Sequence, residues 1–163
     1  MSPHPNLAAL NRYRTEVRHP DVAAFLQHII HIHPANRLPS RSDFNPASVP
    51  ALLPGMVLAD VIRPAHGGAR FRVCVAGETV LNASPVPMMG RFVDEIAAAI
   101  TGGRVIVDVR QTVLDTGCSY YWYGLPRMTF RLDFAKLEYL HCPLAEDGET
   151  IDHVLSFFHY EGA

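Results

Sequence analysis

The fold is decided by the stretch LEYLHCPL (137–144), AEDGET (145–150) and IDHVLSFFHY (151–160). Its two outer segments are rich in aromatic and aliphatic residues, which favour strands. Between them, Asp147-Gly148 supplies the positive φ angle that a tight reversal needs. We therefore predict a hairpin of two long strands. Such strands bury their apolar atoms only if the rest of the chain covers them.

The composition is that of one globular domain that can bury a core unaided. The chain has 163 residues, 48% of them hydrophobic and 18% charged. A formal net charge of -2, without a lysine-arginine cluster, argues against nucleic-acid and membrane-surface partners. No stretch approaches the ~20 apolar residues of a membrane helix, and the start of the chain lacks a signal-peptide pattern. We expect a cytoplasmic protein without a membrane or nucleic-acid partner.

The three cysteines, Cys74, Cys118 and Cys142, are an odd number at wide spacing. This pattern suits buried thiols in a reducing cytoplasm better than a disulfide or a zinc site. His28 and His31 would share one face of a helix, but no nearby carboxylate completes a ligand set. We therefore predict no metal site.

Hydrophobic periodicity places helices before and inside a sheet. Residues 7–17 favour a short helix. Residues 21–33 favour an amphipathic one, whose apolar face would serve as an interaction surface: Val22, Phe25, Leu26, Ile29 and Ile30. Strands are predicted at 56–62 and 70–76. In the second strand, alternation puts Phe71, Val73 and Val75 on one face and Arg70, Arg72 and Cys74 on the other.

The middle of the chain is more ambiguous. Residues 92–100 favour a short helix. In residues 104–116, β-branched residues alternate as in a strand, but valines also recur at intervals of four and Gly117 stands where a helix would end. We predict a helix there, and a strand at 118–124. The resulting order gives an α+β fold: one antiparallel sheet with helices on one face.

Five segments in this order resemble a PAS domain, and in particular a bacterial family of stand-alone single-domain PAS proteins. They are LPSRSDFNP (38–46), LLPG (52–55), RFRVCVAGE (70–78), GRFVDEI (90–96) and YLHCPLAEDG (139–148). The likeness covers roughly residues 20–160. It departs from the family at Glu78, where a threonine is usual, and in the proline-rich segment 84–87.

The resemblance implies a PAS-like five-stranded antiparallel sheet, with short helices and one longer helix enclosing a cavity against it. Residues 1–20 would form an N-terminal extension and residues 21–163 the single domain, with an added leading helix at 21–33 and a core at 56–160. PAS domains bind small molecules in such a cavity or pair with other domains. The resemblance does not identify a ligand or a cofactor.

Seven residues are taken as ligand-binding candidates, each with a structural alternative. Arg72 would hold a carboxylate or phosphate if it faced the cavity, and would be a soluble edge residue if it did not. The run 120–123 alternates across the sheet, which does not decide the pair that faces the cavity; Tyr121 and Tyr123 are the working choice. The other candidates are Cys74, Met88, Met89 and His141.

No sequence motif for catalysis is present, so an enzyme is not expected. The first hypothesis is a sensory or regulatory module that binds a small molecule and signals through protein contacts, to a partner or in a homodimer. The alternative is an interaction or dimerisation module that needs no ligand.

Overall fold

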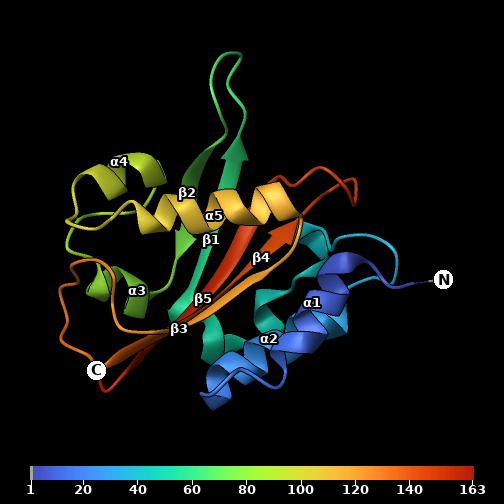
Figure 1. The fold of residues 1–163 in the computed structure, drawn as a ribbon, viewed down its shortest axis with the longest axis horizontal. Coiled ribbons are helices and arrows are strands. Elements are labelled where there is room, and N and C mark those ends of the chain that lie inside the picture. The colour runs from blue at the N-terminus through green and yellow to red at the C-terminus, as the bar shows by residue number, and fades with distance from the viewer. Residues whose placement is uncertain (1) are drawn as a thin grey trace.

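A five-stranded antiparallel sheet organises the computed structural model, which describes residues 2–163 (Figure 1). The sheet order is β2-β1-β5-β4-β3. The α+β class predicted from the sequence is confirmed, and the architecture is compatible with a PAS-like fold. The strands are β1 (Met56–Ile62), β2 (Arg70–Ala76), β3 (Tyr120–Gly124), β4 (Lys136–Leu144) and β5 (His153–Glu161).

The β4–β5 hairpin lies in the middle of the sheet, as its buried composition requires. Leu137 is opposite Tyr160 and Leu144 is opposite His153. Gly148 has φ +83°, the conformation predicted for the turn. The Asp147 carboxylate accepts the backbone N–H groups of Glu149 and Thr150 at 2.8 and 2.7 Å. The turn is therefore held by side-chain chemistry typical of Asp-Gly.

Helices cover both faces of this sheet. The inner face carries Val57, Val73 and Val154 and packs against α3 (Glu78–Ala83), α4 (Val93–Ala98) and α5 (Val105–Thr116). The outer face carries Leu58, Leu155 and Phe157 and packs against α1 (Pro5–Tyr13) and α2 (Pro20–Ile32). These two groups of helices are separate in Figure 1. The connector from α2 to β1 contains three 3₁₀ helices: Arg41–Asp43, Pro46–Ser48 and Pro50–Gly55.

Helix α5 resolves the ambiguity of residues 104–116 in favour of the helix. Gly117 ends it in the left-handed conformation, with φ +67°, and its N–H donates to the Val113 carbonyl. Val109 and Val113 are buried. The alternation of valines that suggested a strand is therefore a by-product of a helix with one apolar side. None of the helices in residues 2–163 has the length and hydropathy needed to cross a bilayer.

The apolar face of α2 is covered by the protein's own sheet. Val22, Phe25 and Ile29 are fully buried, and Leu26 is 2% exposed. Ile30 is half-buried and packs against the same core cluster. The prediction that these residues form an interaction surface is therefore wrong, because the sheet already takes up the area that a partner would need.

A bulge in β2 changes the direction of one predicted side chain. Leu58 is opposite Val75 and Ala59 is opposite Val73, so Cys74 is an extra residue between them. Val75 is consequently 52% exposed, whereas Val73 is fully buried. Strict alternation placed both valines on one face; that assignment is wrong for Val75.

Polar groups anchor the N-terminal segment to the outer face. The buried Asn6 amide oxygen accepts the Ser119 backbone N–H and hydroxyl at 2.6 and 2.8 Å. The buried Glu138 carboxylate accepts the backbone N–H groups of Arg18 and His19 at 2.7 and 2.9 Å. Residues 2–20 are thus integrated into the packing of the domain.

Candidate functional site

A cavity of about 60 Å³ lies between the inner face and helices α3 to α5. Most of its lining is apolar, including Val73 from β2, Ile96 from α4 and Val109 from α5. The loop 125–135 contributes Met128 and Phe130 to its wall. An apolar cavity with a few convergent polar groups is the usual form of a small-molecule site.

Arg110 is the unusual polar group of this cavity. Its side chain projects from α5 and is only 3% exposed. One guanidinium nitrogen, Nη1, donates to the Ile106 carbonyl at 2.8 Å, but Nε has no hydrogen-bond partner. Among residues 2–163, His28 Nε2 is the other buried side-chain nitrogen or oxygen without a partner.

Among residues 2–163, no carboxylate pairs with Arg110, whose hydrogen bond goes to a carbonyl. Burial lowers the pKa of Arg110 to about 10, so the guanidinium stays protonated near neutral pH. A buried charge without a partner reduces the stability of the fold by ~3 kcal/mol or more. Within residues 2–163, the cavity therefore contains a positive charge that no carboxylate pairs with.

His141 lies beside Arg110 but adds no second positive charge. It is 1% exposed, and its Nδ1 is 2.5 Å from the Ser156 hydroxyl. Burial, and then the nearby Arg110, hold the pKa of His141 well below its usual range. The imidazole is therefore neutral, so Arg110 is the charged member of this pair.

Aromatic rings and a second arginine form another wall of the cavity. Trp122 of β3 stacks on Tyr139 of β4, with ring centroids 5.5 Å apart. The exposed Arg127 lies over the Trp122 ring at 4.4 Å and donates to the Tyr139 hydroxyl at 3.0 Å. This arrangement offers a flat apolar surface next to positive charge.

The loop 125–135 is tied down at two points over the cavity. The Thr129 N–H donates to the Thr101 carbonyl at 3.0 Å, and the Arg131 N–H donates to the Ala83 carbonyl at 2.8 Å. Gly102 permits the first contact, because a Cβ atom there would lie 2.4 Å from the Arg127 carbonyl oxygen. Its φ of +77° also favours glycine.

Two of the seven ligand-binding candidates, Met88 and His141, line this cavity. Arg72 and Cys74 instead lie on the outer face, where Arg72 pairs with Asp60 at 2.9 Å. Met89 is 50% exposed. For these three residues, the prediction of a place in the cavity wall is wrong.

The tyrosine pair was also assigned to the wrong face. The Tyr121 hydroxyl donates to Glu138 at 2.5 Å, and Tyr121 packs against the outer core cluster. The Tyr123 hydroxyl lies 3.2 Å from a Glu161 carboxylate oxygen. It is Trp122 that faces the cavity, because its neighbour across the ladder is Tyr139, another inner-face residue.

Sequence reasoning missed Arg110, Trp122 and Arg127. A signal existed for Arg110, because it shares a helix face with Ile106 and Val113, which makes it a charge inside an apolar stripe. For Trp122 the alternation in β3 was visible, but the cavity side was not. Arg127 lies in an irregular loop whose position no local pattern indicates.

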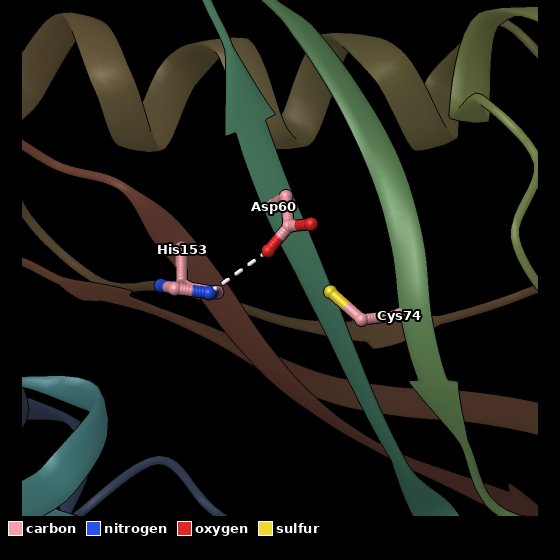
Figure 2. Close-up of side chains that lie close together, drawn as sticks. All are labelled: Asp60, Cys74 and His153. Atoms are coloured by element: carbon pink, nitrogen blue, oxygen red, sulfur yellow. Dashed lines mark ion pairs between the residues drawn. The ribbon is translucent and has the colours of Figure 1, made fainter.

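Within residues 2–163, one group of side chains has the spacing of metal ligands. Asp60, Cys74 and His153 lie together on the outer face, across the sheet from the cavity (Figure 2). This group was not predicted, since its members come from three strands. The pair His28 and His31, considered from the sequence, is not part of it.

Comparison with known proteins adds no assignment. No protein-family model matches the sequence, and no curated protein matches it significantly. The resemblance to PAS domains therefore rests on the sequence segments described above, and the strand arrangement is compatible with it. Any statement about function has to be argued from the cavity and its residues.

Proposed function

We propose that this protein is a PAS-like sensory or regulatory module that binds a small carboxylate in its cavity and signals through protein contacts. The observation that carries the proposal is Arg110, a buried guanidinium that faces the cavity and has an unpaired Nε. A carboxylate accepts two parallel hydrogen bonds from a guanidinium and supplies the missing charge.

The size and lining of the cavity narrow the ligand further. A volume of about 60 Å³ is small beside the ~300 Å³ at which typical drug-sized pockets begin. The neutral His141 and the apolar side chains leave the buried Arg110 as the anchor for charge. These features favour a short monocarboxylate with an apolar tail over a phosphate or a polyanion.

Strands β3 and β4 connect the cavity to the opposite face of the sheet. Trp122 faces the cavity and its neighbour Tyr121 bonds to Glu138 on the outer face. Glu138 in turn holds the backbone between α1 and α2. A ligand that shifts the Trp122 ring therefore acts on the residues that fix the N-terminal segment, and through them on a surface for a partner or a second copy.

Binding of short monocarboxylates to the full chain tests the proposal. We expect thermal stabilisation and binding heat with acids of graded chain length, and neither with the corresponding amides. Native mass spectrometry of the freshly purified protein should also show a bound mass. Arg110→Met should abolish binding, while Arg104→Met, at the 74% exposed Arg104, should retain it. Acids and amides that bind equally, or an Arg110→Met variant that still binds, would contradict the proposal.

The ligand-independent interaction module is less well supported than the sequence suggested. Its interaction surface was the apolar face of α2, which is buried against the sheet. The Arg110 cavity, by contrast, has no explanation in a module that binds no ligand. We therefore propose that ligand binding controls the protein contacts, and that the contacts do not form independently of a ligand.

A further inference from the structure

Three potential metal ligands meet on the outer face of the sheet, from three adjacent strands. Asp60 lies on β1, Cys74 on β2 and His153 at the start of β5, and their ligand atoms are all within 4.8 Å of one another (Figure 2). The ladder explains the meeting, because Asp60 is opposite His153 on one side. On its other side, the β2 bulge inserts Cys74 two residues beyond Arg72, the direct partner of Asp60.

A second layer of charged groups orients two of these ligands. His153 Nδ1 is 2.8 Å from Asp152 Oδ1, which leaves Nε2 directed at Asp60 Oδ1, 2.9 Å away. Arg72 holds the other Asp60 oxygen, Oδ2, at 2.9 Å. A carboxylate behind the distal nitrogen of a histidine is the usual support of a metal-binding imidazole.

We propose that Asp60, Cys74 and His153 bind a divalent transition-metal ion of the zinc type. One carboxylate oxygen, one thiolate and one imidazole nitrogen suit Zn²⁺ or Co²⁺, whereas Mg²⁺ and Ca²⁺ prefer oxygen ligands. All three side chains are partly exposed, so water can complete a tetrahedral shell and the ion has a path from solvent.

The cluster already holds the contacts that a metal ion would replace. Asp60 pairs with His153 and with Arg72, and His153 also lies 2.8 Å from Asp152. Burial, with Asp60 nearby, raises the pKa of the Cys74 thiol to about 11, so the metal-free sulfur is protonated. Binding of a divalent ion would displace the Cys74 thiol proton, because the thiolate is the form that ligates a metal.

An ion-pair network without metal is the competing account, in which the Cys74 thiol is only a hydrogen-bond donor to its neighbours, Asp60 and the Arg72 carbonyl. The pairs of Asp60 with His153 and Arg72 are complete in themselves. The Cys74 thiol makes a 3.7 Å contact with the Arg72 carbonyl, which is a weak interaction. The two accounts therefore differ in whether the sulfur is a thiolate that binds a metal or a thiol that only donates a weak hydrogen bond.

Cobalt(II) titration of the reduced full chain distinguishes them. We expect one ion per chain, with a near-ultraviolet absorption band from thiolate-to-cobalt charge transfer and strong visible bands of a tetrahedral ion. Cys74→Ser should remove the charge-transfer band. Cys118→Ser should retain it, since Cys118 is also partly exposed but lies outside the cluster. Asp152→Asn, which changes only the support of His153, should weaken binding about 10-fold.

Proton release measured in weakly buffered solution gives a second readout that needs no cysteine variant. Binding of Zn²⁺ should release protons, because the Cys74 thiol loses its proton when it becomes a ligand. Absence of the charge-transfer band, its survival in Cys74→Ser, or release of no protons would overturn the proposal. An equal loss of the band in Cys118→Ser would do the same.

Discussion

Each face of the sheet contains a buried charged residue, and the two residues differ in their number of hydrogen-bond partners. On the outer face, the Glu138 carboxylate is 1% exposed and accepts three hydrogen bonds, from the Arg18 and His19 backbone and from Tyr121. On the inner face, Arg110 is 3% exposed, bonds to one carbonyl and keeps an unpaired Nε beside a cavity. The two side chains are about equally buried, and what distinguishes them is the number of hydrogen-bond partners.

This difference predicts opposite effects of removing each charge. A satisfied carboxylate contributes to folding, because its removal leaves its donors without an acceptor. A buried charge that lacks partners opposes folding. Four measurements test or refine this contrast.

Glu138→Ala should have the largest effect. It leaves the N–H groups of Arg18 and His19 unpaired, so we expect a loss of about 3 kcal/mol in the free energy of unfolding. Urea denaturation measures it, with Glu149→Ala as the exposed control. If both variants lost the same small amount, Glu138 would not be the anchor of the N-terminal segment.

The two valines on either side of the β2 bulge allow the same substitution to be compared at a buried and at an exposed position. Val73→Ala should cost about 2 kcal/mol because it opens space in the inner core. Val75→Ala should change stability by less than about 0.5 kcal/mol, since that side chain is half exposed. Equal costs at the two positions would mean that β2 alternates regularly and that Val75 is buried.

His141 should make stability depend on pH in the acid range. Its folded-state pKa lies well below 6.5, so below that pH the unfolded chain takes up a proton that the folded protein does not. Stability should therefore fall as pH drops below this value, with a slope of up to ~1.4 kcal/mol per pH unit from this residue. His141→Asn should reduce that slope, and His31→Asn, at an exposed position, should not.

Arg110→Met should have the smallest effect on stability and the opposite sign. Without ligand, replacing an unpaired buried guanidinium by an apolar side chain should leave stability unchanged or raise it by about 1 kcal/mol. Thermal and urea unfolding of the ligand-free protein measure this. A loss above about 2 kcal/mol would show that Arg110 has a structural partner and would remove the contrast with Glu138.

The sequence was sufficient for the fold where local patterns and packing agree. Strands 56–62 and 70–76 have the predicted bounds, and the Asp147-Gly148 turn has the predicted conformation. The predicted ends of some helices and strands were less accurate. The first helix spans Pro5–Tyr13 instead of 7–17, and β3 begins at Tyr120 instead of 118. Helix ends depend on capping and tertiary contacts that periodicity does not contain.

The sites depended on long-range relations that no local pattern contains. Which face of 120–123 meets the cavity is set by pairing with β4, and the β2 bulge is set by its register with β1. The isolation of Arg110 is a property of everything packed around it. Arginine count and helix periodicity could indicate a buried charge there, but not that it lacks a counter-ion.

The sheet order also determines when the protein can fold during synthesis. Strand β1 pairs with β5, the last of the five strands in sequence, so the centre of the sheet closes only after that strand has left the ribosome. Until then, the β1–β2 ribbon and the apolar side of α2 lack the surface against which they pack, and their apolar side chains stay exposed. Truncation within β5 should therefore leave the whole domain unfolded, with its apolar surfaces exposed to chaperones, rather than remove one edge of a folded sheet.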